Sequence, residues 1–155
     1  MIIQHILTPE RTLSGVLGVS KKKTLEFIAE TLSKEVPVIN ASELFEALVT
    51  REHLGTTGVG NGVALPHCRF KACPEPTGLF IRLEEPIDFD SIDRSPVDLV
   101  FALIVPDGDN QQHLEILQSL AERFSAQNIL DQLRGAPDAM NLFEIITADS
   151  PLTGS

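Results

Sequence analysis

The sequence predicts a single α/β domain, because helical and strand patterns alternate along its 155 residues. A chain of this length buries roughly 68–70 % of its unfolded surface as one domain. No internal repeat and no linker rich in Pro, Gly or Ser divides the chain. We therefore expect one domain over residues 1–148 and a disordered polar tail over residues 149–155.

The first expected elements are an apolar segment, a strand and a helix. Residues 2–7 are expected to dock as a short helix or strand, and residues 16–19 to form an early strand. Ser20 is expected to cap a helix that ends near Lys34. The lysines at 21–23 oppose the helix dipole, and we expect them on a solvated face, with a basic contact patch as the alternative. The buried face repeats at helical spacing and consists of Leu25, Ile28, Ala29 and Leu32.

A second helix is expected after the break at Pro37. Asn40 and Glu43 form a pair similar to a capping box at its start, and the helix is expected to end near Gly55. Arg51 then lies in the last turn, where the helix dipole alone explains a cation. The buried side is expected to consist of Leu44, Ala47 and Leu48.

Three further apolar runs are expected to be strands, at residues 63–65, 78–83 and 97–105. The last run is nearly unbroken and contains Phe and Val, which is typical of a central strand buried on both faces. The segment 87–95 holds three aspartates but lacks the glycine and the closing glutamate of a calcium loop, so we expect a turn.

Three helices are expected in the C-terminal part. The first is capped by Asp109 or Asn110, and the other two cover about 126–134 and 137–147. The face of the first helix that is expected to be buried consists of Leu114, Leu117, Leu120, Ala121 and Phe124.

The stretch TTGVGNGVALPHC at residues 56–68 has the composition of a binding site. Its glycines leave the main chain open to approach, and successive N–H groups there can form an anion-binding concavity. Pro66 restricts the direction in which His67 leaves the strand end, and an imidazole beside free amides can attack phosphorus. The alternative is a tight turn followed by an unremarkable histidine. The absence of lysine excludes the nucleotide-binding P-loop. The loop residues of this candidate site are Gly58, Gly60, Asn61 and Gly62.

A second histidine is expected near the first. His113 lies in the first turn after the central strand, and because sites assemble at strand ends in α/β sheets, it can approach His67. The alternative is a partly buried histidine bonded to nearby backbone. A zinc site that adds Cys68 and Cys73 is disfavoured, because their spacing does not match the usual zinc spacings. We expect no metal and no cofactor.

Composition restricts the partners. The net charge of −10 and the absence of Trp and Tyr argue against nucleic acid, which is bound through basic and stacking side chains. An acidic surface favours a partner with a basic face, or serves solubility alone. No 18-residue apolar run and no signal peptide is present, so we expect no membrane insertion and a cytoplasmic location, which suits two reduced cysteines.

The string T-G-V-G-N-G-V-A-L-P-H resembles the signature of the enzyme IIA domains of the fructose, mannitol and nitrogen-regulatory branches of the bacterial phosphotransferase system. Arg51-Glu52 precedes it as in that family. Further similar segments are Pro86-Ile87-Asp88-Phe89, the run from Pro96 to Pro106, and His113-Leu114. The resemblance extends from about Ile6 to about Thr147.

This resemblance implies a fold, a reaction and roles for the candidate residues. The fold would be a mixed β-sheet with helices on both faces. His67 would accept a phosphoryl group through its Nε2 atom from an HPr-type phosphocarrier protein, and His113 would hydrogen-bond the group and stabilise its charge. Arg51 would steady charge near the site or help to bind the donor. The amides of Gly58, Gly60, Asn61 and Gly62 would cradle the phosphoryl oxygens.

The Gly60-Asn61-Gly62 segment is most similar to the nitrogen-regulatory branch. In that branch the protein is a phosphorylation-controlled regulator of other proteins, including sensor kinases and potassium-transport components. One alternative is a sugar-specific enzyme IIA, which passes its phosphoryl group to an enzyme IIB. A second alternative is a binding module that has kept the fold without the chemistry.

Overall fold

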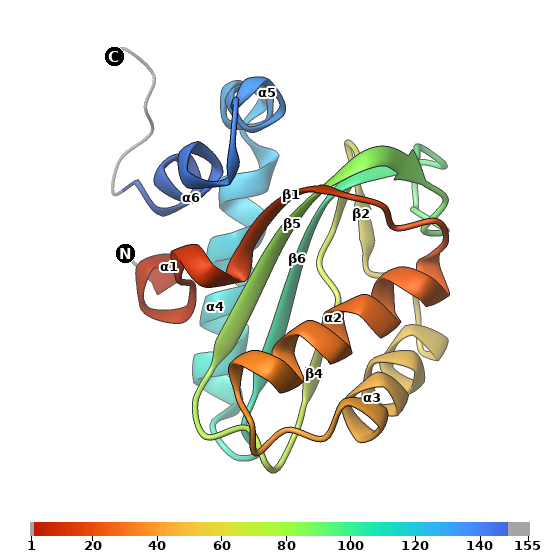
Figure 1. Ribbon diagram of the computed structural model, residues 1–155, viewed down its shortest axis with the longest axis vertical. Helices are drawn as coiled ribbons and strands as arrows, with labels where there is room; N and C mark the ends of the chain where they lie inside the picture. The colour runs from red at the N-terminus through yellow and green to blue at the C-terminus, as the bar shows by residue number, and fades with distance from the viewer. Residues whose placement is uncertain (1, 149–155) are drawn as a thin grey trace.

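The computed structural model describes residues 2–148, in which helices cover both faces of a mixed β-sheet (Figure 1). The α/β fold and the placement of helices on both faces are confirmed. The expected tail, residues 149–155, lies outside the described residues.

The sheet has six strands within the described residues, in the order β1-β5-β6-β3-β2, with β4 also paired to β6. β6 is antiparallel to β5 and parallel to β3 and β4, while β1 is parallel to β5, so the sheet is mixed. The strands are β1 (Thr12–Val16), β2 (Gly58–Gly60), β3 (Val63–Ala64), β4 (His67–Arg69), β5 (Thr77–Ile87) and β6 (Val97–Val105).

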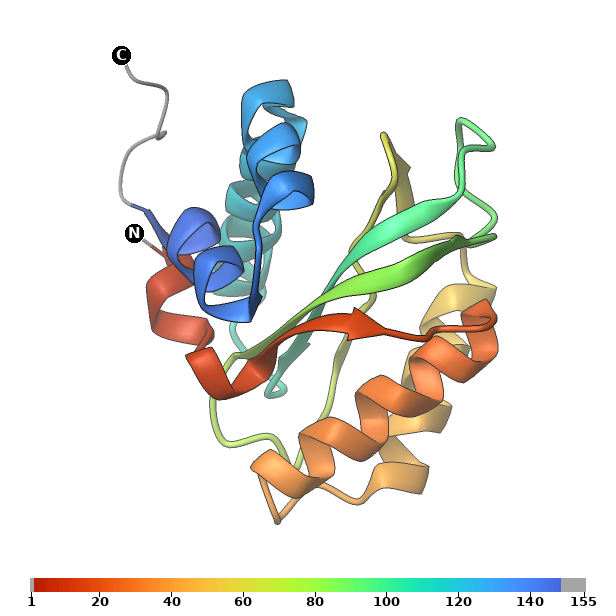
Figure 2. The same cartoon turned by 45° about the horizontal axis from the view of Figure 1, so that its top comes forward.

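Two groups of helices cover the two faces, as Figures 1 and 2 show. α2 (Lys21–Glu35) and α3 (Ala41–His53) lie together on one face. The other face carries α1 (Ile2–Ile6), α4 (Asn110–Ser125), α5 (Gln127–Gly135) and α6 (Ala139–Thr147), and a 3-10 turn, η1 (Pro9–Arg11), leads into β1.

β6 is the centre of both cores, because successive side chains of a strand point to opposite faces. Leu99, Phe101 and Leu103 pack into the cluster that contains α1, α4, α5 and α6. Val100 and Ile104 pack into the cluster with α2 and α3. The expectation of a central strand buried on both faces is therefore confirmed.

The helix starts follow the local sequence. The side chains of Ser20, Asn40, Asp109 and Asp138 each accept a hydrogen bond from a backbone N–H three residues later. Such bonds satisfy donors that the first helical turn leaves free. The three expected N-caps are confirmed, with Asp109 and not Asn110 as the cap of α4.

Two expectations about elements are wrong. The early strand is residues 12–16 and not 16–19: Val19 has a φ of 67°, outside the extended region, and is 79 % exposed. On α4, Leu114 and Ala121 face solvent, because the buried stripe runs through Ile116, Leu120 and Phe124 at a spacing of four residues.

Within residues 2–148, no helix combines the length and the apolar character that crossing a bilayer would require.

Candidate active site

β4 places His67 at the edge of the sheet. His67 lies opposite Leu103 of β6, and the Leu103 N–H donates to the Pro66 carbonyl at 2.9 Å. Because side chains alternate along a strand, Cys68 is buried while His67 is half-buried. The structure therefore presents the imidazole at a surface, one residue after a proline that fixes the direction of the chain.

The His67 ring is held in one tautomer by the backbone. Its Nδ1 atom lies 2.8 Å from the Leu65 carbonyl oxygen. A carbonyl only accepts hydrogen bonds, so in the neutral ring Nδ1 carries the proton and Nε2 keeps its lone pair. Burial lowers the pKa of His67; the Leu65 hydrogen bond and the charge of Glu52 oppose this, and the charge of Arg51 reinforces it. The result is a neutral imidazole whose Nε2 atom is nucleophilic.

His113 from the first turn of α4 lies against His67. The ring centroids are 5.7 Å apart and the planes meet at 73°. The Nε2 atom of His113 is inaccessible to solvent and has no hydrogen-bond partner among the described residues. Burial lowers the pKa of His113, and the charges of His67, Arg69 and Arg51 lower it further. The structure thus brings the two predicted histidines together, and one ring nitrogen of His113 lacks a hydrogen-bond partner among the described residues.

Arg51, in the last turn of α3, acts on this pair through its charge. One guanidinium nitrogen donates to the Gly55 carbonyl at 3.0 Å, which holds the side chain over the end of its own helix. Its charge acts on the pKa of both histidines, so the cation stands within electrostatic reach of each ring. An anion bound between the rings would be attracted to it.

Arg69 is a further cation that sequence reasoning missed. It stands two residues after His67 on β4, so the two side chains leave the same face of the strand, and its charge lowers the pKa of His113. No strand was expected between residues 65 and 78, and only the observed strand reveals the alternation. If a strand had been predicted after Pro66, the alternation of side chains would have placed Arg69 on the same face as His67.

The four predicted loop residues lie elsewhere. Gly58 and Gly60 belong to β2, and Asn61 and Gly62, with φ of 58° and 78°, form the tight turn between β2 and β3. Two positive φ values in a two-residue hairpin turn match the twist of the strands. The structure therefore assigns these residues to a hairpin.

The hairpin turn and His67 lie at different positions along β6. Val63 pairs with Leu99 and His67 with Leu103, so four strand positions, about 13 Å, separate them. In Figure 1, β2 and β4 accordingly occupy opposite ends of the sheet. The Asn61 N–H already donates to Asp93 at 2.9 Å. The structure therefore places the Asn61-Gly62 turn apart from the histidine pair along β6, whereas Gly58, which pairs with Ala64, lies one strand position nearer to His67.

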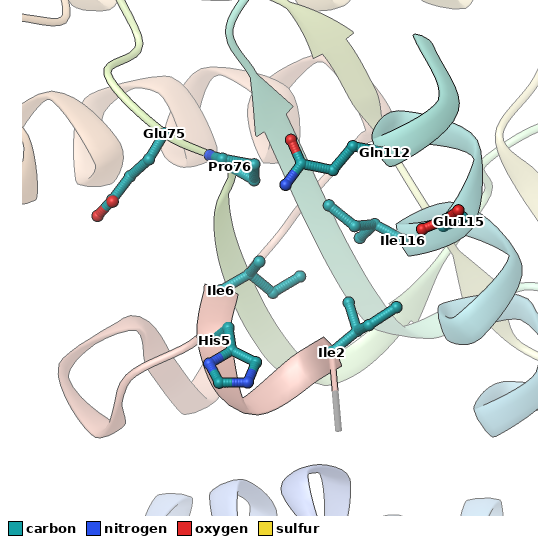
Figure 3. Close-up of a pocket in the computed structure, with 8 residues that line it drawn as sticks. All are labelled: Ile2, His5, Ile6, Glu75, Pro76, Gln112, Glu115 and Ile116. Carbon is teal, nitrogen blue, oxygen red and sulfur yellow. The ribbon is translucent and has the colours of Figure 1, made fainter. Parts of the chain in front are cut away.

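A pocket of about 310 Å³ lies away from the histidine pair, between α1, the start of α4 and the segment before β5 (Figure 3). Its apolar lining comes from Ile2, Ile6 and Ile116, and His5 stands at its edge. Neither His67 nor His113 lines it, so this pocket is separate from the candidate site.

The cysteines do not extend the site toward metal binding. Burial raises the pKa of the Cys68 thiol to about 12, with a smaller contribution from Cys73, and burial also raises the pKa of Cys73. A thiol that stays protonated at neutral pH is a poor ligand. Residues 2–148 contain no group of three or more His, Cys, Asp or Glu side chains arranged to hold a metal ion.

The sequence and the fold match known proteins over nearly the whole chain. The family model described as "Phosphoenolpyruvate-dependent sugar phosphotransferase system, EIIA 2" matches residues 5–149. A nitrogen regulatory protein of Pseudomonas aeruginosa is 45 % identical over 144 residues, which cover 93 % of this chain and 94 % of that protein.

Two solved structures share the fold. Nitrogen regulatory protein IIA-Ntr from Neisseria meningitidis superimposes with a TM-score of 0.87 at 38 % identity, covering 95 % of this chain and 100 % of the other. IIA mannitol from Escherichia coli has a TM-score of 0.75 at 20 % identity over 90 % and 98 % of the two chains, and shows likeness of fold alone. The chain therefore belongs to the EIIA 2 family of the phosphoenolpyruvate-dependent sugar phosphotransferase system, and it resembles the nitrogen regulatory proteins of that family.

Proposed function

We propose that His67 accepts a phosphoryl group from an HPr-type phosphocarrier protein in the cytoplasm, and that its phosphorylation state controls binding to regulated proteins. The observation that carries this proposal is the 2.8 Å contact between His67 Nδ1 and the Leu65 carbonyl. It holds the ring in the tautomer whose Nε2 lone pair is available, beside a second histidine and a cation.

The phosphoryl transfer needs no reactant other than the donor phosphohistidine and His67. The Nε2 lone pair attacks phosphorus in line with the N–P bond of the donor phosphohistidine, and the electrons of that bond return to the donor ring. A donor ring that is protonated on its other nitrogen leaves as neutral imidazole. His67 keeps its proton on Nδ1 and becomes an N-phosphoimidazolium. The protein contributes positioning and charge, which suffice for phosphoryl transfer.

His113 and Arg51 stabilise the phosphoryl group in this proposal. The buried Nε2 of His113 donates a hydrogen bond to a phosphoryl oxygen, which also gives that nitrogen the partner it lacks among residues 2–148. Arg51 and Arg69 supply positive charge. The hairpin glycines have no part in it and serve the turn.

Regulation follows from a change of surface charge. A phosphoryl group adds about −1.5 to −2 charges at neutral pH. Two exposed leucines lie on the elements that form the site: Leu54 directly follows α3, and Leu114 is the residue after His113 in α4. A partner that docks on apolar and cationic groups here would bind the two forms with different affinity. Similarity to nitrogen regulatory proteins supports a regulatory role. As partner classes we propose sensor kinases and potassium-transport components, which the resemblance of the sequence implies.

Intact mass after incubation with phosphoenolpyruvate, enzyme I and the phosphocarrier tests the proposal. We expect one added phosphoryl group on the wild type and none on His67→Ala, under conditions that spare acid-labile phosphate. His5→Ala, which changes an exposed histidine outside the site, is the control and should gain the group. Phosphorylation of His67→Ala at an undiminished rate would contradict the assignment. Rapid onward transfer to a purified enzyme IIB would instead favour a sugar-specific role.

A further inference from the structure

Glu52 is the one acidic or basic residue that is buried among residues 2–148. It stands next to Arg51 in α3, and its side chain is 5 % exposed. A buried carboxylate is retained only when its charge and its oxygens are satisfied. The contacts of Glu52 therefore show what its position requires.

Two residues satisfy this carboxylate. The Lys21 ammonium from the first turn of α2 lies 2.8 Å from Oε2. The Thr57 backbone N–H lies 3.2 Å from both oxygens, and the Thr57 hydroxyl donates to Oε1. Lys21 was expected on a solvated face and instead fixes Glu52. The pair ties α2 and α3 to the segment between α3 and β2.

A continuous chain of hydrogen bonds leads from this pair to His67. The Thr57 carbonyl accepts a bond from the Leu65 N–H at 2.9 Å. The Leu65 carbonyl in turn accepts the bond from His67 Nδ1 at 2.8 Å. Each hydrogen bond fixes the peptide group that makes the next hydrogen bond. A displacement of Thr57 would therefore displace the Leu65 carbonyl, which orients the imidazole.

We propose that Glu52, anchored by Lys21, is a positioning residue for phosphoryl acceptance: through Thr57 and Leu65 it holds the carbonyl that keeps the proton of His67 on Nδ1. The inference rests on the proposed function of His67 and adds to it a residue that never touches the phosphoryl group. It predicts that a change in how α2 packs against α3 alters the orientation of the His67 ring.

The carboxylate also acts on His67 through space. The charged and titratable groups near the ring are Arg51 and Glu52 from α3, Arg69 from β4 and His113 from α4. Of these, only Glu52 raises the pKa of His67. Loss of its charge should therefore lower the pKa of His67, whereas the tautomer of the ring reports the position of the Leu65 carbonyl.

The test is an NMR titration of the histidine ring nitrogens in Glu52→Gln, which keeps the shape and removes the charge. We expect a lower pKa of His67, a larger fraction of the Nε2–H tautomer, and phosphoryl transfer slowed by about 10-fold or more. Glu46→Gln, an exposed glutamate on the same helix, is the matched control and should leave all three unchanged. Thr57→Val keeps the backbone bond and removes only the hydroxyl bond, so a smaller shift of the tautomer is expected.

Urea unfolding of each variant identifies loss of fold. If Glu52→Gln does not fold, Thr57→Val carries the test. A folded variant whose His67 pKa and tautomer match the wild type would overturn the inference. The titration needs no phosphodonor, so it decides the role of Glu52 even if wild-type protein takes no phosphoryl group, an outcome that would contradict the proposed function alone.

Discussion

A substitution at His113 is expected to slow phosphoryl transfer with little effect on stability. Its Nε2 atom has no partner in the described part of the chain, so His113→Gln removes no side-chain hydrogen bond made by that atom. We expect the free energy of unfolding to change by about 1 kcal/mol or less. The rate of phosphoryl transfer should fall about 10²-fold, as when one donor to a developing anion is removed.

Single-turnover transfer from the phosphocarrier, with urea unfolding in parallel, measures both quantities for His113→Gln. His53→Gln, an exposed histidine at the end of α3, is the control and should match the wild type in both. A folded His113→Gln protein with an unchanged transfer rate would remove His113 from the site.

Residues could be predicted from the sequence where the signal is local. Ser20 and Asn40 were predicted as caps because their partners lie three residues away. Glu52 could not be predicted, because Lys21 lies on another helix and the two meet only through packing. The closeness of His67 and His113 followed from the rule that sites assemble at strand ends.

Among the elements, the β2–β3 hairpin is held in place by residues that lie outside its own sequence. The Arg134 guanidinium from α5 donates to the Asn61 carbonyl and pairs with Asp98 at 2.9 Å. A Cβ on Gly62 would overlap Arg134, and the φ of 78° is unfavourable for other residues. The turn chemistry was visible in the sequence as Asn-Gly, but the register with β6 was not, and that register separates the turn from His67.

Gly62→Ala should therefore destabilise the protein by roughly 1–2 kcal/mol and leave phosphorylation of His67 at the wild-type rate. Gly135→Ala, where nothing lies within 4 Å of the added Cβ, is the control and should cost less. Urea midpoints and single-turnover transfer give the two readouts. Loss of transfer in a folded Gly62→Ala protein would restore the phosphoryl-cradling role expected for the loop.

At the scale of the whole molecule, the acceptor strand is supported by β6, which is packed on both faces. Phe101 is fully buried and contacts Phe80 and Phe124, with ring centroids 5.8 and 6.3 Å away. Phe101→Ala should reduce the free energy of unfolding by about 3–5 kcal/mol. The half-buried Phe45 is the comparison, and its replacement by alanine should cost clearly less. Equal losses measured by urea unfolding would contradict the central role of β6.

The fold class and the central strand could be predicted because 97–105 is almost wholly apolar and helical patterns alternate with strand patterns along the chain. The short strands β2 and β4 could not, because three residues with glycine, histidine or arginine carry no strand pattern of their own. They are extended because β3 and β6 offer hydrogen-bonding edges. Tertiary pairing thus determined the elements that hold the candidate site.

The most direct test of the central claim is to locate the phosphorus on the phosphorylated protein by NMR of ¹⁵N-labelled histidine rings. A neutral ring with its proton held on Nδ1 by Leu65 predicts a phosphorus–nitrogen bond at Nε2 of His67, with Nδ1 still protonated. Phosphorus at Nδ1 of His67, or on His113, would contradict the account.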